Sequence, residues 1–285
     1  MNSLGKTLVS RKVKKWIMYY GKRWLPVDVA AGPPVFINSV PKSGTHLLYQ
    51  IFEHDQTLRD FGEFLSSTPS FTMRELPEAY FVRRLNRVRQ GELLRGHLFF
   101  GEQVKSALKR AGIIHYFIYR DPRDVVCSEA HYLANMNRWH RMHSSFAGLA
   151  DQKDRIALAI DGMSNAPGSA YYPNISIRFR RFSGWLKDSH THTVRFEDMV
   201  GEGKKTTMRS IMDYHSELLG LSATRLDQRT AKAVESIDPS RSHTFRKGGG
   251  ARSWERLFDE RLKDRFKAVA GELLVELGYE KDFNW

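Results

Sequence analysis

Apolar runs alternate with amphipathic stretches along most of the chain. Between the apolar runs the apolar residues recur every three or four positions, as in residues 45–54, and this spacing predicts helices. The runs themselves are short and rich in apolar or β-branched residues, which predicts strands at 35–40, 113–120 and 191–200 and a short strand and turn at 93–100. Strands that alternate with helices favour a mainly parallel β-sheet flanked by helices on both faces. The pattern therefore predicts an α/β fold built as a single domain.

Three other stretches have less regular patterns. Residues 60–90 read as loop and helix, and residues 134–175 carry Asn, Ser, Gly and Pro, which suits an irregular lid or substrate loop. Residues 254–277 repeat apolar positions at helical spacing and end before a glycine, which predicts one long final helix. The chain thus divides into a basic N-terminal arm, residues 1–30, and one domain, residues 31–285.

The composition is that of a folded protein from a reducing compartment. Of its 285 residues 41% are apolar, so the chain can bury a substantial core. Its single cysteine, Cys127, excludes an intramolecular disulfide framework and a cysteine-based zinc site. No apolar run reaches the roughly 18 residues that span a bilayer, and no signal-peptide pattern opens the chain. We therefore expect a cytoplasmic protein.

The net charge of +13 indicates anionic partners, and much of it lies at the N-terminus. Residues 1–27 carry seven lysines and arginines and no acid, with Trp16, Tyr19 and Tyr20 beside the lysines. One interpretation is an arm that contacts an anionic membrane peripherally, and the other is a solvated helix. No recognised nucleic-acid-binding motif accompanies the charge, so we expect no nucleic-acid partner. The oligomeric state is left open.

The turn between the first strand and helix has an unusual composition, Pro41-Lys42-Ser43-Gly44-Thr45. A turn at the carboxyl end of a parallel strand directs several backbone N–H groups and the helix dipole at one point, which makes an anion cradle. Gly44 permits a close approach of the backbone. Lys42 adds a positive charge, and Ser43 and Thr45 add hydroxyls. The turn therefore predicts an anion site.

A nucleotide-triphosphate loop is an alternative interpretation of this turn. Such a loop reads G-x-x-x-x-G-K-[ST], with the lysine directly after the second glycine. Here the lysine precedes the glycine, and the strand 113–120 ends in Arg120, which leaves Asp121 facing away from the side that a magnesium ligand requires. A nucleotide kinase or NTPase with an atypical phosphate loop stays an alternative function.

Three segments together resemble the cytosolic-type sulfotransferases, which use 3′-phosphoadenosine 5′-phosphosulfate (PAPS). The segment "PKSGTH" (41–46) is similar to their 5′-phosphosulfate loop, and "YRDPRDVVCSEAHYL" (119–133) resembles their 3′-phosphate motif. The segment "FRKGGGARSWERLF" (245–258) is similar to their C-terminal RKG motif. The three occur in family order over about 220 residues. The resemblance implies a PAPS-dependent sulfotransferase domain with a P-loop-like strand, loop and helix.

The resemblance also implies two anion sites on one cofactor. The 5′-phosphosulfate is assigned to Lys42, Ser43, Gly44, Thr45 and His46, and the 3′-phosphate to Arg120, Ser128, Arg246, Lys247 and Gly248. Because PAPS differs from ATP by its 3′-phosphate, a second anion site is needed far along the chain from the first. Sulfuryl transfer should resemble phosphoryl transfer, with preplaced cations and N–H groups that stabilise the departing charge. We expect Lys42 at the bridging oxygen, 3′,5′-ADP as the product and no metal.

Two residues are candidates for the base that deprotonates the acceptor. His97 occupies the position of the histidine in the family's K-x-H-L segment, and a histidine titrates near neutral pH. Glu63 lies 21 residues after Lys42, close to the spacing of the catalytic glutamate in carbohydrate-type sulfotransferases. Leu47 stands where many relatives place a tryptophan against adenine.

The acceptor is expected to be a hydroxyl or amine, but its class is open. The arginines of residues 74–89, the polar loop 134–175 and the basic arm suggest a carbohydrate or glycolipid. A small phenol or alcohol is the other choice, since four aromatic residues could line an apolar pocket: Phe99, Phe100, Tyr132 and Trp139. A further alternative function is a membrane- or nucleic-acid-binding module on a degenerate sulfotransferase fold.

Overall fold

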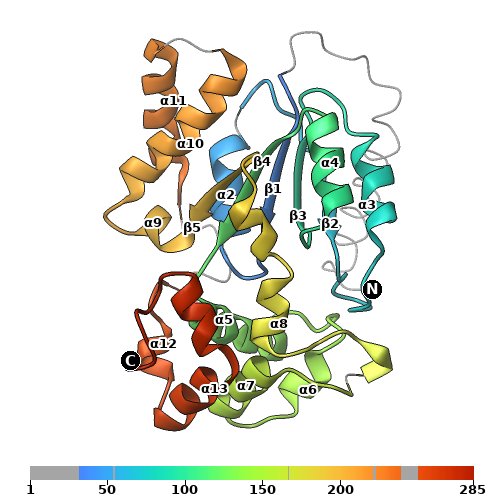
Figure 1. Ribbon diagram of the computed structural model, residues 1–285, viewed down its shortest axis with the longest axis vertical. Coiled ribbons are helices and arrows are strands. Elements are labelled where there is room, and N and C mark those ends of the chain that lie inside the picture. The colour runs from blue at the N-terminus through green and yellow to red at the C-terminus, as the bar shows by residue number, and fades with distance from the viewer. Residues whose placement is uncertain (1–31, 54, 166, 221–222, 239–249) are drawn as a thin grey trace, which may run out of the picture.

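The computed structural model describes residues 32–285 apart from 54, 166, 221–222 and 239–249, and a five-stranded sheet forms its centre (Figure 1). All neighbouring strands are parallel, in the order β2-β3-β1-β4-β5. The strands are β1 (Val35–Ser39), β2 (Phe64–Ser66), β3 (Leu93–His97), β4 (Ile114–Tyr119) and β5 (Thr191–Arg195). The α/β prediction with a mainly parallel sheet is confirmed.

The central strand β1 is apolar throughout because both faces of the sheet are covered. Successive side chains of a strand point to opposite faces. Val35 and Ile37 accordingly pack in one apolar cluster with α2, α10 and α11, whereas Phe36 packs in a second cluster with α3, α4 and α5. All three side chains are fully buried. This is why the strand has no polar alternation in the sequence.

Twelve α-helices and two short 3₁₀ segments are found in the part of the chain that the structure describes. Those before the fifth strand are α2 (Thr45–Phe52), α3 (Glu78–Leu85), α4 (Glu102–Arg110), α5 (Pro122–Asn135), α6 (His143–Ala147), α7 (Gln152–Asp161), η2 (Pro167–Ser169), α8 (Ile175–Arg180) and η3 (Ser183–Lys187). Those after it are α9 (Phe196–Val200), α10 (Lys204–Leu219), α11 (Ala223–Ser236), α12 (Trp254–Leu257) and α13 (Glu260–Glu276). None of the described helices is long and apolar enough to cross a membrane.

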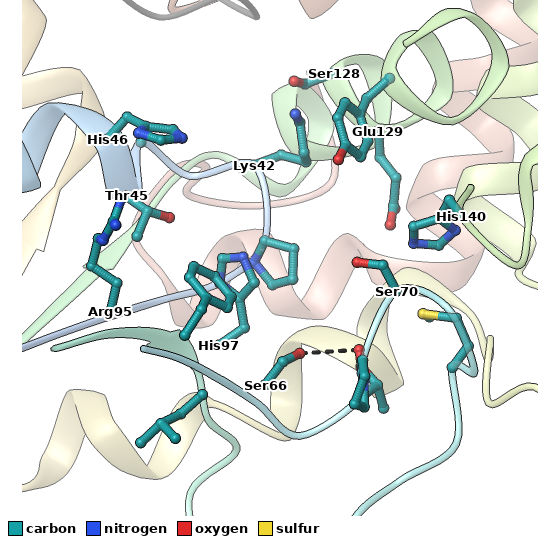
Figure 2. A pocket seen from close by; sticks show the side chains of 18 of the residues that line it. Lys42, Thr45, His46, Ser66, Ser70, Arg95, His97, Ser128, Glu129 and His140 are labelled. Atoms are coloured by element: carbon teal, nitrogen blue, oxygen red, sulfur yellow. Dashed lines mark hydrogen bonds between the residues drawn. The ribbon is translucent and has the colours of Figure 1, made fainter. Parts of the chain in front are cut away.

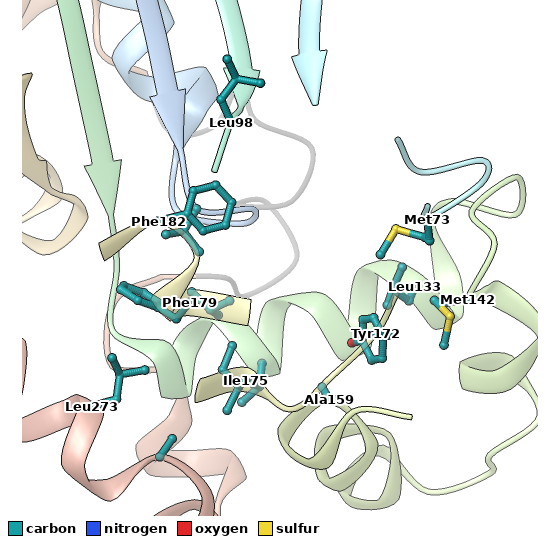
Figure 3. Packing of buried hydrophobic residues seen from close by; sticks show 14 of the residues in the cluster. Met73, Leu98, Leu133, Met142, Ala159, Tyr172, Ile175, Phe179, Phe182 and Leu273 are labelled. Atoms are coloured by element: carbon teal, nitrogen blue, oxygen red, sulfur yellow. The ribbon is translucent and has the colours of Figure 1, made fainter. Parts of the chain in front are cut away.

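A group of helices lies beyond the carboxyl ends of the strands. Figure 1 shows α5, α6, α7, α8, α12 and α13 gathered below the sheet, and Figure 3 shows the strand arrows ending above α5. Apolar residues such as Leu133, Tyr172 and Phe179 join this group to the core beneath the sheet. Helix α5 begins as predicted, with Pro122 in its first turn and the Asp121 carboxylate accepting a hydrogen bond from the Arg123 N–H. The strand ends therefore face a second layer, and a site can form between the two.

Three of the predicted elements need correction, and one strand was not predicted. The segment 191–200 is strand only to Arg195, and residues 196–200 form α9. Residues 134–175 contain α6 and α7, whose buried faces pack on α5, so the segment is more regular than its Asn, Ser, Gly and Pro content indicated. The expected final helix is divided in two, because Asp259 accepts from the Leu262 N–H and starts α13 afresh. Strand β2, within residues 60–90, was not predicted; its three residues are too few for a period-2 pattern.

Candidate active site

The loop between β1 and α2 has the backbone that the anion-cradle prediction requires. Lys42 and Gly44 both have positive φ angles, of 69° and 99°. A Cβ atom at Gly44 would lie only 2.6 Å from Cδ2 of Phe196, so a side chain has no room there. Gly44 directly precedes α2, and its carbonyl accepts the N–H of Leu47 at 2.9 Å. The loop thus presents the N-terminus of α2, and its positive potential, to one point.

A cavity of about 550 Å³ opens at this point, at the carboxyl ends of the strands (Figure 2). Seven of the predicted site residues line it: Lys42, Gly44, Thr45, His46, His97, Arg120 and Ser128. Ser43 does not; its hydroxyl is buried and finds no hydrogen-bond partner among the described residues. Ligand sites of parallel sheets form at this edge. The cavity is therefore the candidate active site.

Lys42 places its ammonium group inside the cavity. Its Nζ lies 3.9 Å from the centroid of the Tyr132 ring, an arrangement in which the ring stabilises the cation. Burial lowers the pKa of Lys42 to about 8; Glu129 raises it and Arg120 lowers it further. His46 faces the cavity one turn away, and its partial burial, together with Arg95 and Lys42, lowers its pKa. Lys42 is therefore charged at neutral pH and loses its positive charge as the pH rises through about 8.

His97 is held by Ser39, which the sequence did not single out. Its Nδ1 lies 3.1 Å from the carbonyl oxygen of Ser39 and 3.0 Å from the hydroxyl, and that hydroxyl lies 2.6 Å from Oγ1 of Thr45. Because the carbonyl only accepts, Nδ1 carries the proton and Nε2 keeps its lone pair. Burial lowers the pKa of His97 to about 4. The ring is therefore neutral at physiological pH and basic at Nε2.

Asn38 fixes the end of the strand that carries His97. Its amide N–H donates to the Leu98 carbonyl at 3.1 Å, and its amide oxygen accepts from the Leu98 N–H at 2.8 Å. The paired backbone register of β1 and β3 ends at Asn38 and Gly96, so this fully buried side chain extends the pairing by two residues. His97 is thereby held at the cavity wall rather than in a free loop.

The second predicted anion site adjoins the first. Arg120 is 3% exposed, and its NH1 group lies 3.5 Å from the Lys42 carbonyl oxygen. Its NH2 donates to the Gly250 carbonyl at 2.7 Å, and its guanidinium stacks on Phe196 at 4.4 Å. Ser128, two turns along α5, has a buried hydroxyl with no hydrogen-bond partner among the described residues. Such a hydroxyl suits a ligand oxygen, since a buried polar group without a partner is costly.

The third part of the predicted site cannot be placed. Arg246, Lys247 and Gly248 lie outside the described residues, as does the basic arm. The chain returns beside Arg120 at Gly250, and Asp124 accepts from the backbone N–H groups of Arg252 and Trp254. Asp124 was not predicted. The available sequence signal was its spacing of four residues from Arg120 at the start of a helix, which is the spacing of an ion pair.

Glu63 lies outside the set of cavity-lining residues. It is buried and forms an ion pair with Arg84, whose Nε donates to Oε1 at 2.7 Å. Arg84 does line the cavity, so Glu63 contacts a cavity residue without lining the cavity itself.

Of the four aromatic residues expected at an acceptor pocket, only Tyr132 lines the cavity; Phe99 packs on Phe182, and Phe100 on Trp185. Trp139 is 79% exposed. Glu129 and His140, which the sequence did not single out, line the cavity.

The cavity offers no metal site in the described residues. No group of three or more His, Cys, Asp or Glu residues is placed to hold a metal ion in that part of the chain. The charged groups that line the cavity are instead mostly cations: Lys42, Arg84, Arg95 and Arg120. A cavity of this kind stabilises phosphate or sulfate oxygens directly.

Solved structures that were compared with the chain share its fold. A mouse sulfotransferase, SULT7A1, complexed with PAP matches with a TM-score of 0.58 at 19% identity, covering 87% of each chain. The structure of retinol dehydratase in complex with androsterone and the inactive cofactor PAP matches with a TM-score of 0.55 at 15% identity. A second structure of retinol dehydratase, in complex with retinol and PAP, matches with a TM-score of 0.52 at 16% identity. Both alignments cover 87% of this chain and 82% of the other. No curated protein matches the sequence.

The sequence itself matches the model of one protein family, described as the sulfotransferase domain, over residues 32–278. The match takes in the Lys42 loop, His97 and the Arg120–Ser128 pair, which the structure brings to one cavity. The resemblance drawn from the three sequence segments is confirmed, and the chain belongs to the sulfotransferase domain family.

Proposed function

We propose that the enzyme transfers a sulfuryl group from PAPS to a hydroxyl group of an amphipathic acceptor that enters the cavity. The observation that carries the proposal is the 3.5 Å contact between Arg120 and the Lys42 carbonyl. This contact brings the two predicted anion sites, which are 78 residues apart in sequence, close enough for one nucleotide to span both. The structural relatives named above were each solved with PAP, the product that carries both phosphates.

The residues of the loop are assigned to the phosphosulfate end of the cofactor. The N–H groups at the start of α2 and the hydroxyl of Thr45 bind its oxygens, and Lys42 offsets the negative charge that develops on the leaving oxygen. Arg120 and Ser128 take the 3′-phosphate, through a planar donor fork and a hydroxyl. PAPS, when bound, supplies the sulfuryl group. Lys42, Arg120 and the helix N-terminus together supply the positive potential for which NTPases use magnesium.

His97 is assigned as the base that receives the acceptor proton. Its proton on Nδ1 is fixed by the Ser39 carbonyl, so the free lone pair of Nε2 is the acceptor of that proton. The contact from Thr45 through Ser39 to His97 ties the base to the phosphate loop. Glu63 is assigned a positioning role, since it holds Arg84 at the cavity wall.

An amphipathic alcohol or phenol fits the cavity better than a large glycan. Its walls combine the apolar side chains of Met73, Leu76 and Leu133 with the hydroxyls of Ser66 and Ser70. A carbohydrate or glycolipid stays the alternative, which the basic composition favours. In both cases we place the enzyme in the cytoplasm, with residues 1–27 as a peripheral membrane contact.

Turnover with labelled PAPS tests the proposal. The full chain should transfer sulfuryl groups to simple phenols in the presence of EDTA, and should neither bind nor hydrolyse ATP with magnesium to a comparable extent. ATP turnover that needs magnesium, with no transfer from PAPS, would favour the nucleotide kinase or NTPase. If deletion of residues 1–27 abolishes membrane binding and leaves transfer intact, the arm is an anchor. Membrane or nucleic-acid binding with no transfer at all would favour the non-enzymatic module.

A further inference from the structure

The carboxylates near the cavity are distributed unevenly. Three cations on its wall have an acidic partner that does not line the cavity: Arg84 pairs with Glu63, Arg95 with Asp60 and Arg120 with Asp124. Glu129 is the only carboxylate among the described residues that line the cavity. The other acids therefore hold cations in place from behind, whereas Glu129 faces the space that a ligand fills.

Glu129 is held rigidly. An NH2 group of Arg178 donates to its Oε2 at 2.8 Å, and the side chains of both residues are 13–14% exposed. Arg178 is itself fixed by hydrogen bonds to the carbonyl groups of Pro173 and Ala159 and by stacking on the Tyr172 ring at 4.2 Å. A carboxylate positioned in this way loses little entropy when it binds a ligand group.

His140 adds a hydrogen-bond donor beside this acceptor. The Met142 N–H donates to its Nδ1 at 3.1 Å, so the neutral ring carries its proton on Nε2. Burial lowers the pKa of His140, which keeps the ring neutral at physiological pH, while the nearby Glu129 raises it. The two side chains lie side by side on the cavity wall (Figure 2) and offer complementary groups, an acceptor on Glu129 and a donor on His140.

In Figure 2 the pair lies across the cavity from Thr45 and His46, which are assigned to the phosphosulfate, whereas Glu129 directly follows Ser128 on α5. Figure 2 shows His46, Thr45 and Arg95 on one side, Glu129, His140 and Ser70 on the other, and Lys42 and His97 between them. The loop that carries Ser70 is joined to that of His140, because the Ser70 carbonyl accepts from the Arg141 N–H at 2.8 Å. A molecule that reacts at His97 can thus extend toward Glu129.

We propose that Glu129 and His140 form a subsite for a second hydroxyl group of the acceptor, remote from the hydroxyl that is sulfated. A hydroxyl donates to the carboxylate and accepts from the imidazole at once, which matches both partners. An ammonium group satisfies only Glu129, and a carboxylate is repelled by it. The acceptor class is then a phenol that carries a second hydroxyl group at its far end. The inference rests on the proposed function.

Four phenols that differ only at the far end test the subsite: 4-(2-hydroxyethyl)phenol, 4-propylphenol, tyramine and 4-hydroxyphenylacetate. The measured quantity is the ratio of kcat/KM for each to that for 4-propylphenol. We expect the hydroxyethyl compound to have the highest ratio in the wild type. Glu129→Gln should lower this ratio about tenfold, because the neutral amide oxygen accepts a weaker hydrogen bond than the carboxylate does. A merely structural role of the Glu129–Arg178 pair would change stability and leave the ratio unchanged.

Two further variants keep the test decisive. His140→Ala should lower the same ratio, which covers the case in which Glu129→Gln fails to fold. Glu75→Gln is the matched control: it removes an exposed carboxylate that pairs with Arg181 and does not line the cavity, so it should leave the ratio as it is.

The possible failures point to different parts of the account. Equal ratios in the wild type, or ratios that Glu129→Gln and His140→Ala leave unchanged, would overturn the subsite. A protein that binds 3′,5′-ADP but sulfates none of the four phenols would also overturn the subsite. The cofactor assignment would survive that result. A protein that does not bind 3′,5′-ADP at all would overturn the proposed function itself.

Discussion

Asp124 holds Arg120 by a buried ion pair, with Oδ2 3.1 Å from the NH2 group and the two side chains 0% and 3% exposed. The same carboxylate accepts from the N–H of Arg252 at 2.7 Å and from the hydroxyl of Ser253 at 2.8 Å. It also accepts from the N–H of Trp254. An acid thus lies beside a site assigned to a phosphate, where its negative charge opposes ligand binding. Its contacts indicate that it positions hydrogen-bond donors from two distant segments.

Replacing Asp124 separates these two effects. If charge alone mattered, Asp124→Asn would tighten the binding of 3′,5′-ADP. We expect weaker binding instead, by about tenfold, because the new amide N–H₂ would face the N–H groups of Arg120 and Arg252 that Oδ2 now accepts from, and unsatisfied buried donors cost about 1–3 kcal/mol. The dissociation constant from isothermal titration calorimetry measures this.

The binding of 5′-ADP is the internal control for Asp124→Asn. Because 5′-ADP lacks the 3′-phosphate, its affinity should fall less than that of 3′,5′-ADP. Ser253→Ala removes one of the same contacts without burying a new donor, and should show a smaller loss. Tighter binding of 3′,5′-ADP to Asp124→Asn would show that the carboxylate acts through its charge.

Lys42 should set an alkaline limit to activity. Its pKa is lowered to about 8, so in the free enzyme the cation is lost as the pH rises through that value. The value of kcat/KM for PAPS reports the free enzyme and should fall above about pH 8. Lys42→Arg retains a cation at all these pH values and should remove this limb while lowering the rate. An unchanged alkaline limb in Lys42→Arg would assign it to another group.

His97 and Glu63 are distinguished by their effects on rate. His97→Ala should lower kcat by roughly 10²–10⁴, the usual contribution of a positioned base. With a pKa near 4, the base stays deprotonated as the pH falls, so activity should persist to about pH 5, well below the usual titration of histidine. Glu63→Gln should instead reduce stability, because it leaves Arg84 without its carboxylate. A larger loss of kcat in Glu63→Gln than in His97→Ala would make the glutamate the base.

Three histidines with lowered pKa values should make the protein sensitive to acid. Burial lowers the pKa of His97 to about 4, of His115 to about 3 and of His215 to about 4. The unfolded chain, with histidine pKa values near 6.5, therefore binds more protons below that pH, and stability is lost as the pH falls from about 6.5 toward 4. Each histidine contributes on the order of 1–2 kcal/mol by pH 5, so the Tm should fall by roughly 5–10 °C between pH 7 and 5.

His115 offers the direct check on this explanation. His115→Asn keeps a donor toward the Thr191 hydroxyl, which lies 2.8 Å from Nδ1, and removes the titrating group. Calorimetry should find a shallower loss of Tm with acid in this variant. An equal loss would mean that other groups, such as the paired carboxylates, cause the acid sensitivity.

The sequence was sufficient for the features that depend on local pattern. The loop of residues 41–45 could be predicted because its glycine, lysine and hydroxyls are contiguous and lie between an apolar strand and an amphipathic helix. The start of α5 was equally local, since Asp121 and Pro122 form its cap. These signals identify most of the residues that we assign to the cofactor.

Features that depend on distant contacts could not be predicted. Asp124 receives donors from residues that lie 128–130 positions later. Glu129 follows Ser128 directly, yet only the packing of α8 against α5 shows that it faces the cavity. Trp139 reads as a pocket aromatic in the sequence and is exposed, because burial depends on tertiary structure rather than on residue type.

The most direct test of the account compares the thermal stabilisation of the full chain by 3′,5′-ADP and by 5′-ADP at the same concentration. Two anion sites on one nucleotide predict that 3′,5′-ADP raises the Tm by roughly 5–10 °C at about one hundred times its dissociation constant, and that 5′-ADP raises it much less. Arg120→Ala should remove most of the difference. Equal shifts with the two nucleotides in the wild type would contradict the assignment of Arg120 and Ser128 to a 3′-phosphate, and with it the sulfuryl donor.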